Sequence, residues 1–151
     1  MKRIRNIGSA IEPNIKPLCD ALNRIESVRT YFSCQGHFWR GLPPYVLFDA
    51  DTAAAAALEK ELREDSRSQS PKLRAPWQMT GWFSDTFKLR FRLDSPIYNR
   101  KTGSWLCFAF REKVLKRDFV VLTEMVENLH DRFLKDKEQN HRKHEQANPH
   151  V

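Results

Sequence analysis

The sequence predicts a single α+β domain in which helices cover a mainly antiparallel sheet of about five strands. Two observations support this fold class. Short segments of alternating polarity follow one another with only turn residues between them, which is typical of hairpins rather than of parallel crossovers. Longer segments with apolar residues at helical spacing lie near the beginning, the middle and the end of the chain. The length of 151 residues suits one domain with its own hydrophobic core.

The first half of the chain predicts the order helix, strand, strand, helix. The first helix begins at Pro17, because proline fits the first helical turn. Strands over residues 27–34 and 45–50 follow, and the short loop of glycines and prolines between them favours a hairpin. Asp51 can cap a helix that runs to about Glu64. Strict alternation in the first strand would place four residues on one face: Val28, Thr30, Phe32 and Cys34.

The second half predicts three strands and a helix, so that the full order is α-β-β-α-β-β-β-α. A hairpin over residues 77–83 and 86–93 turns at Ser84-Asp85, and a further strand covers residues 104–110. Asp118 caps the last helix. The apolar stripe of that helix consists of Phe119, Leu122, Val126, Leu129 and Phe133. Residues 1–136 form the expected domain, and the polar residues 137–151 predict a disordered C-terminal tail.

Charge and cysteine content indicate the class of partner and the compartment. The chain has 26 Lys+Arg against 19 Asp+Glu, a net charge of +7. Such an excess favours a polyanionic partner, nucleic acid or an acidic protein face, although solubility alone can account for it. No apolar stretch is long enough to span a membrane, and no secretory segment precedes the three cysteines, which predicts a cytoplasmic protein with reduced thiols.

A basic strand is the clearest functional pattern. Between residues 87 and 93 an alternating pattern directs Phe87, Leu89, Phe91 and Leu93 into the core and places Lys88, Arg90 and Arg92 on the other face. Alternate residues of a strand lie roughly 6.6 Å apart, similar to successive phosphates of an extended nucleic acid. Further candidate phosphate contacts are Arg100, Lys101 and Arg111, and candidate stacking residues are Trp82, Tyr98 and Trp105. The alternative is an ordinary solvated sheet face.

A second candidate is the loop that contains Ser33, Cys34, Gln35, Gly36, His37, Trp39 and Arg40. Cys34 and His37 are the candidate catalytic residues, because an imidazole can activate a thiol. The same pair could supply two metal ligands, but the sequence shows no second close pair, so no metal site is predicted. Backbone amides around Gly36, together with Gln35 and His37, could instead form part of a ligand or phosphate pocket.

Residues 30–37, Thr-Tyr-Phe-Ser-Cys-Gln-Gly-His, resemble the Ser-Cys-Ser-Gly-Arg segment of the wybutosine-synthesis methyltransferases that act on phenylalanine tRNA. The resemblance implies a related fold and an S-adenosylmethionine-dependent RNA modification involving Ser33, Cys34 and Gly36. The sequence departs from the family at Gln35 and at His37, where the family has arginine. Apart from this implied S-adenosylmethionine, no cofactor is predicted.

Three functions follow from these patterns. The leading one is a small nucleic-acid-binding accessory protein that contacts phosphates through the basic strand, with RNA and DNA not distinguished. The second is an RNA-modification enzyme with the Ser33–His37 loop near its cofactor. The third is a protein-binding inhibitor or regulator encoded by a mobile element, which would use the basic face against an acidic protein.

Overall fold

The fold is α+β, with a four-stranded antiparallel sheet and three α-helices. A computed structural model describes residues 11–37, 42–98 and 108–147. Along the chain these comprise α1 (Lys16–Arg24), β1 (Arg29–Cys34), β2 (Tyr45–Asp49), α2 (Thr52–Arg67), β3 (Gln78–Phe83), β4 (Leu89–Asp94), the 3-10 turn η2 (Pro96–Tyr98) and α3 (Phe108–Ala147). The strands lie in the order β1-β2-β4-β3, and every neighbouring pair is antiparallel.

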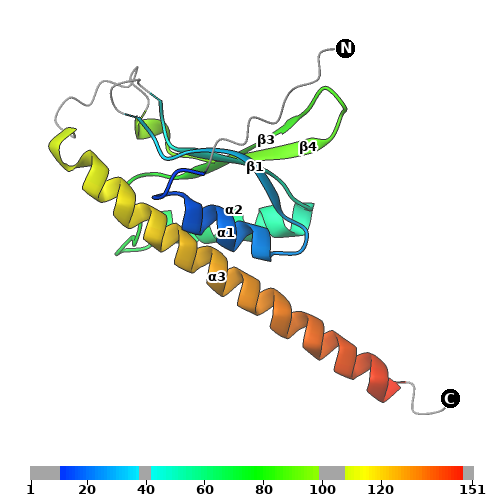
Figure 1. The fold of residues 1–151 in the computed structure, drawn as a ribbon. Coiled ribbons are helices and arrows are strands. Elements are labelled where there is room, and N and C mark those ends of the chain that lie inside the picture. The colour runs from blue at the N-terminus through cyan, green and yellow to red at the C-terminus, as the bar shows by residue number, and fades with distance from the viewer. Residues whose placement is uncertain (1–10, 38–41, 99–107, 148–151) are drawn as a thin grey trace.

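The three helices lie together on one face of the sheet, which is therefore the covered face (Figure 1). The core forms between these two layers. Val46 and Phe48 of β2 and Phe91 and Leu93 of β4 are buried there against α1, α2 and α3. On the opposite face, no described element covers the sheet. Within the described part of the chain, one side of the sheet is thus left without a covering layer.

Several predicted local features are confirmed. Both hairpins form, and the Asp51 carboxylate accepts a hydrogen bond from the amide of Ala54 at 2.7 Å, as a helix cap. The apolar stripe of the last helix packs into the core, where its first four members are buried and the fifth, Phe133, is partly buried. The helical period of the sequence therefore identified the core residues of the last helix correctly.

The end of the sheet differs from the prediction, because among the described residues the sheet has four strands rather than five. Of the expected strand over residues 104–110, residues 104–107 lie outside the described residues and 108–110 belong to α3. Asp118 does not cap α3 but lies within it and is fully buried. Its carboxylate accepts hydrogen bonds from the amides of Arg74 and Ala75, at 2.8 and 3.0 Å, and from the Trp77 indole at 3.1 Å. Asp118 therefore anchors the segment before β3 to α3.

The basic strand is shorter than the sequence predicts. Phe87 was expected in the core, but it lies in the turn with a φ of 57° and its side chain is 87% exposed. Two backbone hydrogen bonds close this turn, from Phe87 to Ser84 at 2.8 Å and from Ser84 to Lys88 at 2.9 Å. The turn therefore takes up residues 85–87, and β4 begins only at Leu89.

β1 also departs from strict alternation. Its register against β2 shifts between Thr30 and Phe32, so that Tyr31 is an extra residue in the strand. Such a bulge interrupts the pleat, so neighbouring residues need not face opposite sides. The rings of Tyr31 and Phe32 lie 5.7 Å apart in an edge-to-face contact. The expected shared face for Thr30, Phe32 and Cys34 is thus broken at the bulge.

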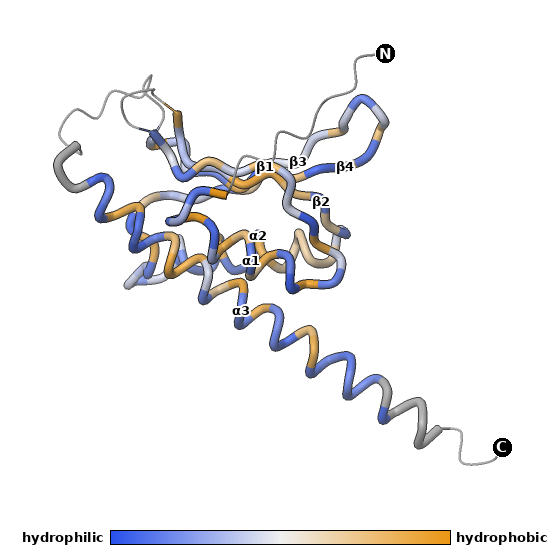
Figure 2. The backbone as a smooth tube through the Cα atoms, in the orientation of Figure 1, coloured by the Kyte–Doolittle hydropathy of each residue, from blue (hydrophilic) through white to orange (hydrophobic). Residues whose placement is uncertain are grey.

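α3 extends well past the sheet (Figure 1). Hydrophilic residues dominate this distal part (Figure 2), and the helix continues to Ala147, through most of the segment in which composition predicts a disordered tail. Arg132 pairs with Glu61 of α2, and Lys137 contacts Glu26. Lysine, glutamate, glutamine and alanine have high helix propensity, which favours this continuation. None of the helices among the described residues has both the length and the apolar character that a membrane span requires.

Candidate functional site

The uncovered side of the sheet carries a mixed aromatic and charged surface, which we call the open face. Residues directly opposite each other on antiparallel strands point to the same side, so the register assigns its members. Trp82 lies opposite Arg90, and Leu47 lies opposite Arg92. By the same register, and by the ring contacts of Tyr31, the open face comprises Arg29, Tyr31, Phe32, Tyr45, Leu47, Asp49, Gln78, Thr80, Trp82, Arg90, Arg92 and Asp94, with the buried Cys34 at its edge opposite Tyr45.

Two arginines of the open face stack on tyrosines. The Arg90 guanidinium carbon lies 4.8 Å from the ring centroid of Tyr31, and that of Arg92 lies 4.7 Å from the ring of Tyr45. These cation–π contacts hold each guanidinium along the sheet surface. Burial raises the pKa of Tyr31, while the charge of Arg90 acts in the opposite direction. Tyr31 therefore remains a neutral ring at neutral pH.

Two aspartates partly neutralise the predicted basic row. Asp49 pairs with Lys88 at 2.6 Å and lies 3.3 Å from Nε of Arg90, while Asp94 pairs with Arg92 at 2.7 Å. Nε of Arg90 and Oδ1 of Asp49 are buried, yet they do not meet hydrogen-bond geometry. Lys88, Arg90 and Arg92 do lie near one another, but as members of ion pairs rather than as a bare row of positive charge.

The other predicted phosphate contacts do not join this surface in the described residues. Arg111 of α3 donates a hydrogen bond to the carbonyl of Tyr98 at 2.9 Å and stacks on its ring at 4.9 Å. Burial lowers the pKa of Arg111. Tyr98 is itself buried, so its ring offers no surface for base stacking. Four further candidates, Trp39, Arg40, Arg100 and Lys101, lie outside the described residues, as does Trp105.

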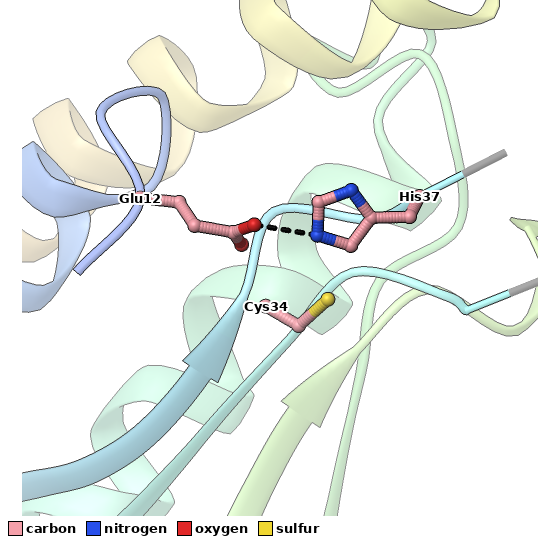
Figure 3. A group of neighbouring side chains, drawn as sticks. All are labelled: Glu12, Cys34 and His37. Atoms are coloured by element: carbon pink, nitrogen blue, oxygen red, sulfur yellow. Dashed lines mark ion pairs between the residues drawn. The ribbon is translucent and has the colours of Figure 1, made fainter. Parts of the chain in front are cut away.

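The second site is a cluster of Glu12, Cys34 and His37 (Figure 3). One potential ligand atom from each residue lies within 4.8 Å of the other two. Oε1 of Glu12 lies 2.5 Å from Nε2 of His37. The other carboxylate oxygen accepts a hydrogen bond from the amide of Gln35 at 2.6 Å, and the Gln35 side chain accepts one from the amide of Asn14 at 3.2 Å. This reciprocal pair fastens the segment before α1 to the end of β1.

Local backbone geometry brings Cys34 and His37 together. Gly36 has a φ of +87°, and a Cβ at this position would lie 3.2 Å from the nitrogen of Pro44 and 3.3 Å from the side chain of Leu115. Glycine is therefore required by both conformation and space. Beyond it, His37 and Leu42 exchange backbone hydrogen bonds of 3.0 and 3.1 Å, which hold the two ends of the loop together.

The amides of this loop already have acceptors within the chain. Gln35 donates to Glu12, Gly36 donates to the Cys34 sulfur at 3.4 Å, and His37 donates to the carbonyl of Leu42. The predicted phosphate pocket needs amides that point outward to an anion. In this conformation the amides of Gln35 and Gly36 instead contact side chains of the cluster, and the amide of His37 closes the loop.

The orientation of His37 bears on the predicted nucleophile. A base that activates a thiol must direct a ring nitrogen at the sulfur. Nε2 of His37 contacts Glu12, and Nδ1 lies on the edge of the ring away from Cys34 (Figure 3). The arrangement thus resembles a set of converging ligands more closely than a thiol with its base.

Sequence reasoning missed Glu12 and, apart from Trp82, the aromatic members of the open face. Glu12 precedes the loop by a long stretch of chain that contains α1, so no local spacing could connect it with Cys34. The contribution of Phe32 depends on the bulge, which alternation does not reveal. Tyr45 could have been found, because its alternation with buried Val46 and Phe48 places it on the opposite face.

No family model, curated protein or solved structure matches the chain. The resemblance to the wybutosine-synthesis methyltransferases therefore stays a prediction based on residues 30–37. The resemblance implicates Ser33, Cys34 and Gly36. Cys34 and Gly36 lie at the Glu12–Cys34–His37 cluster, whereas the side chain of Ser33 forms a hydrogen bond with the thiol of Cys19 in α1.

Proposed function

We propose that this protein is a small nucleic-acid-binding accessory protein and that single-stranded nucleic acid lies across its open face. The observation that carries the proposal is a sheet face that no described element covers and on which aromatic rings alternate with guanidinium groups. Exposed bases stack on such rings, and phosphates pair with the adjacent cations.

Phe32 supplies the most accessible ring of this surface. It is 58% exposed on β1, although burying a phenylalanine is favourable by about 2 kcal/mol. Trp82 provides a second, half-buried ring on β3. A sheet face that only had to meet water would be expected to carry polar side chains at these positions. Two rings on strands at opposite edges of the sheet suit a ligand that crosses it.

Phosphate binding would proceed by exchange of anions. Arg92 is held by Asp94, and Arg90 and Lys88 share Asp49, so a phosphate that approaches either pair competes with a carboxylate of this chain. Lys88 and Arg92 are partly exposed, and ion pairs of such side chains contribute only about 0–1 kcal/mol, so exchange at these two cations requires little energy. The two aspartates would also weaken binding to other polyanions that offer no base for stacking.

Fluorescence anisotropy with labelled single-stranded RNA, single-stranded DNA and duplex DNA tests the proposal, at several salt concentrations. The protein should be purified in the presence of nuclease. We expect single strands to bind more tightly than the duplex, with affinity that falls as salt rises, because bound phosphates release counterions. The double variant Arg90→Gln, Arg92→Gln should reduce the slope of log affinity against log salt by about 1.5.

The matched control is the double variant Lys60→Gln, Arg63→Gln on α2. It removes the same charge at exposed positions of the helical layer, where both side chains pair with glutamates one turn away. Its salt slope should stay close to that of the unaltered protein. Equal effects of the two double variants would mean that only net charge matters, and no binding at low salt would refute the proposal in favour of a protein partner. A reducing compartment such as the cytoplasm, which the cysteine content favours, fits this role.

A further inference from the structure

Three side chains of different chemistry converge at the end of β1. Glu12 comes from the segment before α1, Cys34 ends β1, and His37 lies in the loop beyond it. Their oxygen, sulfur and nitrogen atoms all lie within 4.8 Å of one another. In a tetrahedral site with metal–ligand bonds of about 2.0 to 2.3 Å, neighbouring ligand atoms are about 3.3 to 3.8 Å apart. Small rotations of these side chains would bring them to those distances.

The types of the three atoms select the metal. Thiolate and imidazole are ligands of borderline and soft transition metals, whereas magnesium and calcium bind oxygen alone. We propose that Glu12, Cys34 and His37 bind a zinc ion, with the fourth position left to water or to a ligand atom from a partner. When zinc binds, it replaces the thiol proton of Cys34, which passes to the solvent.

The surroundings hold two of the three ligands in place before any metal arrives. The amide of Gln35 fixes one oxygen of Glu12, and the amide of Gly36 donates to the Cys34 sulfur, where it would stabilise a thiolate. Hydrogen bonds of this kind orient metal ligands and are part of a functional site. Gly36, whose positive φ sets the turn at this point, is the residue whose amide reaches the Cys34 sulfur.

The contact between Glu12 and His37 fits the same role. Nε2 of His37 faces Oε1 of Glu12 at a distance of 2.5 Å. The two ligand atoms therefore already point at one another, and a cation would bind between them. Both side chains are about one-third exposed, at 28% and 35%, while Cys34 is buried. A zinc ion between them would thus be held from the inside by sulfur and remain accessible from the outside.

The site borders the open face without depending on it. Cys34 lies opposite Tyr45 in the sheet, and Tyr45 carries the stacked guanidinium of Arg92. None of the three proposed ligands belongs to the residues tested for nucleic-acid binding. Zinc binding and nucleic-acid binding can therefore fail or succeed separately.

Titration of the reduced full-length chain with Co²⁺, a spectroscopic substitute for zinc, tests the proposal. We expect one equivalent to bind, with a thiolate-to-cobalt charge-transfer band in the near ultraviolet that Zn²⁺ abolishes by displacement. The variant Cys34→Ser should lose this band. The matched control Cys19→Ala removes the other buried thiol of the described residues and should keep it. Cobalt bound by the histidines near the C-terminus, such as His141 and His144, would give no such band.

A third variant separates loss of a ligand from loss of the fold. Glu12→Gln keeps an oxygen that can accept from the Gln35 amide but removes the anionic ligand, and it should weaken zinc binding by at least about 10-fold. Zn²⁺ should raise the unfolding temperature of the unaltered protein and of Cys19→Ala, because binding to the folded state stabilises it, but not that of Cys34→Ser. Absence of the band in the unaltered protein, its persistence in Cys34→Ser, or full affinity in Glu12→Gln would each overturn the three-ligand site.

Discussion

The two faces of the sheet are held by different forces. On β4, Phe91 and Leu93 are buried beneath the helices, whereas Arg90 and Arg92 lie between tyrosines and aspartates on the open face. Removal of apolar area from water, at about 25 cal/mol per Å², drives the packing of the covered face. The ion pairs of the open face are partly exposed and contribute much less. In the described residues, the packing that holds the fold together therefore lies on one side of the sheet, while the other side carries the charged and aromatic residues of the open face.

This comparison predicts that replacing phenylalanine by alanine lowers stability on the covered face but lowers nucleic-acid affinity on the open face. Phe48 is 1% exposed on the covered face, and Phe32 is 58% exposed on the open face. Phe48→Ala leaves a cavity in the core and should lower the free energy of unfolding by about 3–5 kcal/mol. Phe32→Ala should change it by no more than about 0.5 kcal/mol, yet weaken nucleic-acid binding by about 1–3 kcal/mol through the lost stacking.

Urea unfolding followed by circular dichroism measures the first effect, and anisotropy at fixed salt measures the second. Phe48→Ala also serves as the control for binding, provided that it is assayed where it remains folded, since its open face is unaltered. If Phe32→Ala destabilised the protein as strongly as Phe48→Ala, the two faces would not be energetically distinct. If it bound nucleic acid normally, stacking at this edge of the sheet would be excluded.

The next largest effect concerns the layer of helices. Asp118 of α3 is the single acceptor for two amides and one indole of the segment that leads into β3. Asp118→Ala would leave these donors without a partner in a buried site, and each such donor costs about 1–3 kcal/mol. We expect a loss of about 2–4 kcal/mol in unfolding free energy, some of it recovered by water that enters the space.

Asp118→Asn provides the sharper version of this test. The amide has nearly the same volume, but it keeps only one acceptor oxygen, and its NH₂ group would face an N–H donor. It should therefore destabilise the protein by about as much as the alanine variant, or more. A stability equal to that of the unaltered protein would show that shape, rather than hydrogen bonding, is what Asp118 supplies.

Asp118 also illustrates how far the sequence predicts the fold. Periodicity identified the stripe from Phe119 to Leu129, because burial repeats with the helical period. The sequence pattern also placed the start of the helix at Asp118, because aspartate is a common helix cap. This prediction was wrong, since the actual partners of Asp118 lie more than forty residues earlier in the chain. Asp51, whose partner is three residues away, was predicted correctly. Local hydrogen bonds can be read from the sequence, and distant ones cannot.

The candidate sites follow the same rule. The pair Cys34 and His37 was visible because it lies in one loop, while Glu12 joins it only through tertiary contacts. Alternation placed Arg90 and Arg92 on one face, but the aspartates that neutralise them belong to β2 and to the end of β4. The bulge at Tyr31 breaks the alternation itself. The chemistry of these sites therefore depends on strand register, which the sequence pattern alone did not determine.

The smallest effect, and the most specific to the covered face, concerns the thiol of Cys19. Burial beneath the sheet raises the pKa of Cys19 above its ordinary value of 9.0, and a hydrogen bond from Ser33 opposes this only in part. The folded state thus disfavours the thiolate, so the contribution of this residue to stability is complete below pH 9 and is lost as pH rises through the raised pKa. One retained proton gives a slope of at most about 1.4 kcal/mol per pH unit.

Urea unfolding at a series of alkaline pH values should reveal this loss, and Cys19→Ala should abolish the part that begins near pH 9. Tyr31 provides the comparison from the open face. The pKa of Tyr31 is also raised, but from 10.0. Tyr31→Phe should therefore leave the slope of unfolding free energy against pH unchanged just above pH 9 and reduce it only at higher pH. If the slope just above pH 9 survived in Cys19→Ala, another group would cause it, and ionisation of the Cys19 thiol would not lower stability as its burial predicts.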